Sequence, residues 1–61
     1  MNMMQFDDLV INVDNVTHIE VCEEGVSTVI HFVSGVRRVI QTPYKTVYKR
    51  LYKMFMGASI L

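Results

Sequence analysis

Four side chains that could bind a metal lie in two short segments of the chain. His18, Glu20 and Cys22 alternate along the first segment, and His31 lies in the second. If a two- or four-residue loop joins the segments as a hairpin, His18 and His31 stand directly opposite, with Cβ atoms ~5 Å apart. Imidazole, thiolate and carboxylate groups together suit zinc. A three-residue loop would break this register, and the sequence has no C-x-x-C or H-x-x-x-H spacing, so we predict ordinary strand histidines with no metal and no cofactor.

Nucleophilic catalysis is the other chemistry that these residue types suggest, with Cys22 as the nucleophile and a histidine as the base. Such catalysis also needs a group that orients the base, an oxyanion hole and a pocket. A chain of 61 residues offers little room for them. The carboxylate pairs Asp7-Asp8 and Glu23-Glu24 are sequence neighbours that point apart on an extended chain, and three glycines form no phosphate-binding loop. We predict that the protein is not an enzyme.

The length and composition predict one small domain over residues 1–61. The chain is 51% hydrophobic and 20% charged, which excludes disorder. A domain of this size buries only ~60% of the surface of its unfolded chain, so its core is marginal. The single cysteine cannot close an internal disulfide, and neither a secretory leader nor a membrane span is evident in the sequence. These features favour a reducing cytoplasm.

Hydrophobic periodicity predicts four strands and one helix. Apolar and β-branched residues fill segments 9–13, 16–23, 26–33 and 36–41, with turn-forming residues between them. Segment 26–33 is apolar on both faces and should therefore lie centrally in the sheet. The predicted fold class is α+β: an antiparallel β-meander of three to four strands followed by one C-terminal amphipathic helix (ββββα).

Thr42 is expected to be the N-cap of the helix and Pro43 to lie in its first turn. The helix should continue for about a dozen residues, with Gly57 as its stop. One stripe carries Lys45, Lys49 and Lys53. The opposite, apolar stripe consists of Tyr44, Val47, Tyr48, Leu51, Met54 and Phe55.

One helix can cover only one face of a four-stranded sheet. We assign to the helix side Ile19, Val21, Ile30, Phe32 and Val39. The residues left for the other face are Val29, Val33, Val36 and Ile40. Because exposed apolar patches of this kind usually mark interfaces, we predict a homo-oligomer that assembles through these four residues. The alternative is that sheet twist and the termini cover them.

Charge order suggests a second surface. All six acidic residues precede Gly25 and all six basic residues follow Val36, so the neutral chain is acidic in its first part and basic in its last part. The predicted partner contacts are Arg37, Arg38, Lys45, Lys49, Arg50 and Lys53. Their partner is a protein, or alternatively a nucleic acid, since Tyr44, Tyr48 and Tyr52 interleave with them. Zero net charge and an expected core position for Tyr44 and Tyr48 favour a protein partner. The alternative is that these charged residues form a solvent-exposed helix face with no partner.

The order of features from Leu9 to about Lys53 resembles the small FlbD/SwrD-type flagellar and swarming-associated proteins. The resemblance lies in the Asn-x-Asp stretch within Val10 to Glu20, the strand Thr28 to Gly35 and the helix Tyr44 to Lys53. The first half is also similar to LytTR-type DNA-binding domains, whose further basic segment this chain is too short to hold. The first resemblance implies a non-enzymatic accessory factor. We therefore expect a self-associating interaction protein, either a bacterial accessory factor or a phage-encoded inhibitor of a host system.

Overall fold

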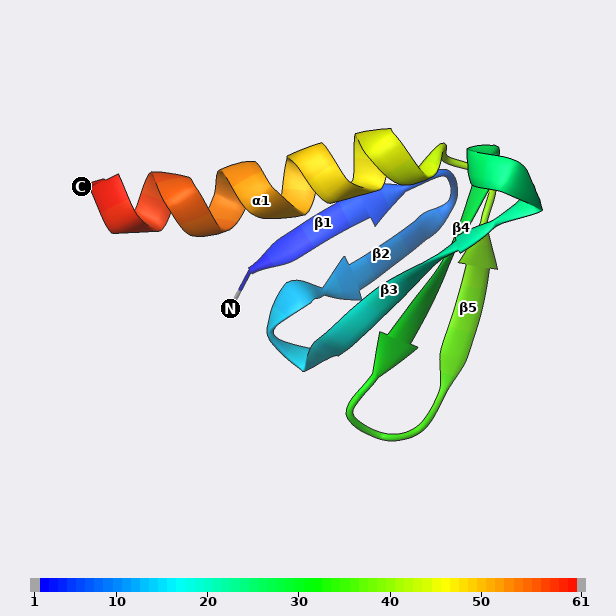
Figure 1. Cartoon of the computed structure of the whole chain (residues 1–61). Coiled ribbons are helices and arrows are strands. Elements are labelled where there is room, and N and C mark those ends of the chain that lie inside the picture. Colours follow the sequence, from blue (N-terminus) through cyan, green and yellow to red (C-terminus); the bar gives the residue numbers. More distant parts are fainter. Residues whose placement is uncertain (1, 61) are drawn as a thin grey trace.

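The computed structural model describes the backbone of residues 2–60 and the side chains of residues 2–54. Its strands are β1 (Met3–Phe6), β2 (Leu9–Asn12), β3 (Val16–Cys22), β4 (Ser27–Phe32) and β5 (Arg37–Ile40), followed by the helix α1 (Tyr44–Ile60). Two short 3-10 turns, η1 (Val13–Asn15) and η2 (Glu23–Gly25), flank β3. The strands form an antiparallel β1–β2 hairpin and an antiparallel sheet in the order β3-β4-β5 (Figure 1). The predicted α+β class is confirmed, and so is the central position of β4.

The first half of the sheet differs from the predicted meander. Strand β2 pairs with β1, which the sequence did not predict, instead of with β3. Turn η1 separates β2 from β3, and the Asn12 side chain stabilises it by accepting a hydrogen bond from the Asp14 amide at 3.1 Å. The strand Met3–Phe6 was not predicted because it contains one aromatic residue and no β-branched residue, so its strand propensity is weak.

A single core joins the hairpin, the helix and one face of the three-stranded sheet. Its buried side chains are Phe6, Ile11, Val13, Ile30, Ile40, Val47 and Leu51. Since β1, β2 and α1 all contribute to this cluster together with β4 and β5, the hairpin and the helix cover the same face of the sheet. Side chains on the other face of the sheet are absent from this core.

The pairing of β5 corrects two sequence assignments. Ile40 lies opposite Thr28 and is 3% exposed, whereas Val39 lies opposite Val29 and is 55% exposed. The prediction that Ile40 points away from the helix and Val39 towards it was therefore wrong. Side chains alternate along a strand, so a one-residue difference in register exchanges the two faces. Val21 lies on the covered side, as assigned, because it pairs with Thr28 in the same row as Ile40, but it is exposed near the η2 end of the edge strand β3.

Helix α1 runs for 17 residues from Tyr44 to Ile60, so Pro43 precedes the helix and does not lie in its first turn as predicted; its carbonyl accepts from the Val47 amide at 3.1 Å. The helix therefore passes through Gly57, which was expected to end it. A glycine inside a helix costs only ~1 kcal/mol relative to alanine, so it weakens a helix without having to stop it. The amphipathic pattern is confirmed for the described side chains, because Val47 and Leu51 are buried and the three lysines are exposed. Within residues 2–60, no helix has both the length and the apolar character that crossing a bilayer requires.

Candidate functional site

The uncovered face of the three-stranded sheet, here called the outer face, collects most of the predicted site residues. Two rows of paired residues cross its strands. One row consists of His18, His31 and Arg37, and the other consists of Glu20, Val29 and Val39. The β3–β4 connection consists of residues 23–26, one of the two loop lengths that place His18 opposite His31. The register condition on which a metal site depended is therefore met.

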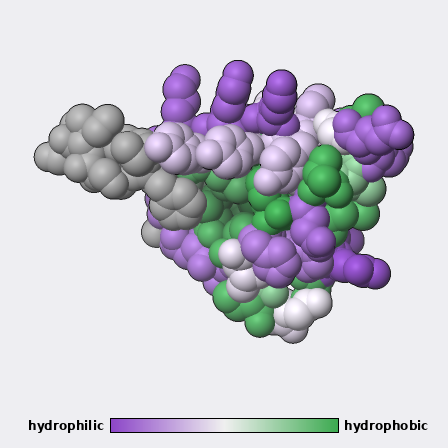
Figure 2. Space-filling view, viewed as in Figure 1, coloured by the Kyte–Doolittle hydropathy of each residue, from purple (hydrophilic) through white to green (hydrophobic). Residues whose placement is uncertain are grey.

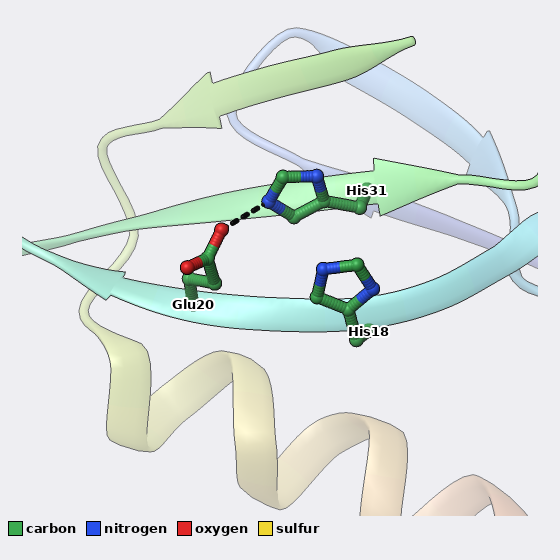
Figure 3. Close-up of side chains that lie close together, drawn as sticks. All are labelled: His18, Glu20 and His31. Atoms are coloured by element: carbon green, nitrogen blue, oxygen red, sulfur yellow. Dashed lines mark hydrogen bonds and ion pairs between the residues drawn. The ribbon is translucent and has the colours of Figure 1, made fainter. Parts of the chain in front are cut away.

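Three polar side chains converge on the outer face (Figure 3). The rings of His18 and His31 are stacked, with centroids 4.1 Å apart and an interplanar angle of 10°. His31 Nε2 is hydrogen-bonded to Glu20 Oε1. Possible ligand atoms of His18, Glu20 and His31 all lie within 4.8 Å of one another. Two neighbouring strands thus hold two imidazoles and a carboxylate as one cluster, which we call the His–Glu–His cluster.

A β-bulge at Thr17 positions His18 in this cluster. The β3–β4 register shifts between Val16 and His18, which leaves Thr17 as the extra residue. The Thr17 hydroxyl donates to the His31 carbonyl oxygen at 3.3 Å and lies 2.9 Å from His18 Nδ1. A hydroxyl has only one hydrogen to donate, so Nδ1–H of His18 is the donor in the second contact when the hydroxyl hydrogen serves the His31 carbonyl. This tautomer leaves the lone pair of His18 at Nε2.

Cys22 is the fourth side chain of the predicted set and lies outside the His–Glu–His cluster. It is half-buried on β3, where it pairs with Ser27. The Ser27 hydroxyl donates to Glu23 Oε1 at 3.0 Å. The structure therefore brings together three of the four candidate ligands.

The predicted assembly residues divide between the surface and the core. Val29 is half-buried on the outer face, and Val33 and Val36 are exposed in the β4–β5 connection. Ile40 belongs to the core and cannot take part in assembly. Val39 takes its place on the outer face, and we call Val29, Val33, Val36 and Val39 the valine patch.

The predicted basic contacts do not form one surface. Lys45, Lys49 and Lys53 are exposed at four-residue spacing and form one stripe along α1. Arg50 instead lies against the hairpin, with its guanidinium carbon 4.4 Å from the centre of the Phe6 ring and Nη1 donating to the Gln5 carbonyl at 2.9 Å. Arg37 and Arg38 are neighbours on β5 and thus point to opposite faces.

Within residues 2–54, no ion pair joins the acidic first part of the chain to its lysines and arginines. Among residues 2–54, the only ion pair joins Glu20 to His31, and no lysine or arginine nitrogen lies within 4 Å of a carboxylate oxygen. The lysine stripe of α1 is therefore available for anionic partners.

Three tyrosines form a ladder beside the lysine stripe. The ring centroids of Tyr44 and Tyr48 are 6.4 Å apart, and those of Tyr48 and Tyr52 are 5.9 Å apart with the rings stacked. Tyr48 and Tyr52 are half-exposed, so the expected core position of Tyr48 was wrong. They border an apolar groove between α1 and β3 whose floor includes Val13, Ile19 and Leu51. Figure 2 shows apolar surface below the row of helix side chains.

No known protein family, curated protein or solved structure matches this chain.

Proposed function

We propose that the protein is a small, non-enzymatic, cytoplasmic factor that self-associates through its outer face and acts by binding another protein. The observation that carries this proposal is the valine patch, with Val29 and Val39 on the outer face and Val33 and Val36 in the β4–β5 connection, beside a sheet whose opposite face contributes to the core. Contiguous exposed apolar surface is uncommon on monomeric proteins and usually marks an interface. Small domains also gain stability from association because their own cores are marginal.

The helix supplies the surface for a second partner. Its lysine stripe lies on α1, away from the strands that carry the valine patch, and has no carboxylate partner among residues 2–54. An acidic protein surface is complementary to such a stripe and would be steered towards it. A bacterial accessory factor or a phage-encoded inhibitor of a host system fits this combination of self-association and protein contact.

Analytical ultracentrifugation of matched lysine variants tests the assembly. Val39 and Val10 are both strand valines with 55% of their surface exposed, but Val10 lies on β2 of the separate hairpin. We expect Val39→Lys to dissociate the oligomer, since a lysine in the centre of an apolar contact must be desolvated. Val10→Lys should leave the assembly intact. A wild-type protein that sediments as a lone 7.1 kDa particle at millimolar concentration would contradict the proposal.

Nucleic-acid binding is the second candidate, and the exposed tyrosine ladder favours it. Exposed aromatic rings beside cations bind unstacked bases and phosphates of single strands. Three lysine–phosphate contacts would contribute about 2 to the slope of log affinity against log salt concentration. We therefore expect a variant with Lys45, Lys49 and Lys53 changed to glutamine to lose this part of the salt dependence.

The control for this test is the double variant Arg37→Gln and Arg38→Gln on β5, which should retain most of the binding. Fluorescence anisotropy with labelled random single-stranded DNA and RNA, from low to physiological salt, measures both effects. Absence of binding at low salt would exclude this second candidate and leave protein contact as the role of the lysine stripe.

A further inference from the structure

We propose that His18, Glu20 and His31 form a binding site for a late first-row divalent cation, with Zn²⁺ as the representative ion. The site uses one copy of the chain and does not depend on self-association. Its donor set is two imidazole nitrogens and one carboxylate, a combination that occurs in zinc sites with an open fourth position.

The distances within the cluster are close to those that a metal needs. With zinc–ligand distances of about 2.0–2.2 Å, tetrahedral ligand atoms lie about 3.3–3.6 Å apart. The possible ligand atoms here lie within 4.8 Å of one another. His18 is exposed on the edge strand β3 and the Glu20 side chain is 59% exposed, so rotation of these two side chains can close the remaining gap.

The protonation pattern around the cluster suits a metal at the Nε2 atoms. The Thr17 hydroxyl is hydrogen-bonded to His18 Nδ1, so Nε2 is the nitrogen that a metal would bind, with the hydrogen on Nδ1. Metal-binding histidines are commonly fixed in this way by a hydrogen bond from the other ring nitrogen. At His31, Nε2 is hydrogen-bonded to Glu20 Oε1, so a metal would replace the hydrogen that these two atoms share. The surrounding hydrogen bonds thus leave both imidazoles able to present Nε2.

The donor types also determine which ions should bind. Imidazole ligands suit zinc, copper and nickel, whereas magnesium and calcium prefer sites made of oxygen atoms. Arg37 pairs with His31 on the same face and opposes any cation, while the Glu20 carboxylate offsets its charge. We therefore expect selectivity for late first-row ions and no binding of Mg²⁺ at millimolar concentration.

The test is a competition titration of the untagged, chelator-treated chain with Zn²⁺ and a chromophoric indicator. We expect one zinc ion per chain in the wild type and a loss of at least about tenfold in affinity for His18→Gln and for Glu20→Gln, because removing a ligand costs no less than removing a supporting hydrogen bond. Glu23→Gln is the control for Glu20→Gln, and Cys22→Ser tests whether the thiol contributes; both should bind as the wild type does. His31→Gln removes the third proposed ligand. If this variant fails to fold, His18→Gln on the edge strand still decides whether the cluster binds zinc.

Nuclear magnetic resonance of the imidazole nitrogens provides the independent measurement. Zinc should shift the Nε2 resonances of both histidines and leave Nδ1 of each as the protonated nitrogen. Zinc binding that survives the His18→Gln and Glu20→Gln changes, or a wild type that fails to compete with the indicator, would overturn the proposal. Neither outcome would bear on the valine patch, since sedimentation of chelator-treated protein tests that separately.

Discussion

A single hydroxyl connects the backbone of the sheet to the chemistry of its outer face. The bulge places Thr17 beside both histidines, so its hydroxyl donates to the His31 carbonyl and is also hydrogen-bonded to His18 Nδ1. Without the extra residue, the side chain at this position would alternate to the other face. The bulge therefore acts as a positioning device, and Thr17 is a positioning residue rather than a ligand.

Removing this hydroxyl should weaken zinc binding without unfolding the protein. Thr17→Val keeps the branched shape and loses the acceptor for Nδ1–H, so we expect affinity for Zn²⁺ to fall by about 10- to 100-fold, as for other supporting hydrogen bonds of metal ligands. Thr17→Ser, which retains the hydroxyl, should restore most of it. Because Thr17 is exposed, the free energy of unfolding without metal should change by less than about 0.5–1 kcal/mol. Indicator competition and thermal unfolding measure the two quantities, and a valine variant that binds like the wild type would remove Thr17 from the site.

At the scale of elements, Asp7 joins the hairpin to the segment that leads into the helix. Its carboxylate accepts hydrogen bonds from the Gln41 amide at 2.8 Å and from the Thr42 hydroxyl at 3.2 Å. Asp7 has a φ of 54°, a left-handed conformation that aspartate tolerates better than most residues. This turn thus ties β1 and β2 to the end of β5, and the Arg50 contact with Gln5 ties the same hairpin to α1. Together they hold the hairpin and helix over one face of the sheet and leave the outer face open.

The elements also show how far the sequence could predict the site. The sequence predicted the opposition of His18 and His31 only for a two- or four-residue loop, and the β3–β4 connection has four residues. The sequence could not show which of Val39 and Ile40 faces the core, since both residues are apolar and hydrophobic alternation cannot distinguish them. Likewise, the contacts of Asp7 with Gln41 and of Arg50 with Gln5 join residues far apart in the chain. No local sequence pattern predicts such contacts. The sequence therefore predicted that one face of the sheet is open, but it placed Ile40 on that face instead of Val39.

At the scale of the whole molecule, one small core must hold two sheets and a helix together. The seven buried hydrophobic side chains of the described part come from β1, β2, η1, β4, β5 and α1, so nearly every element depends on the same cluster. A 61-residue domain is expected to have a free energy of unfolding of only about 3–9 kcal/mol. Loss of one core contact should therefore unfold the whole molecule instead of one element.

Ile40→Ala tests this shared core and the register of β5 together. Truncating a buried isoleucine costs about 2–5 kcal/mol through lost burial and the cavity left behind. This loss is comparable to the whole stability expected of so small a domain, so we expect the variant to be largely unfolded or to melt far below the wild type. Val39→Ala, one residue away and exposed, should cost less than about 1 kcal/mol. Thermal and urea unfolding followed by circular dichroism measure both variants; if Val39→Ala were the more damaging change, β5 would have the opposite register, and the valine patch would lose its central member.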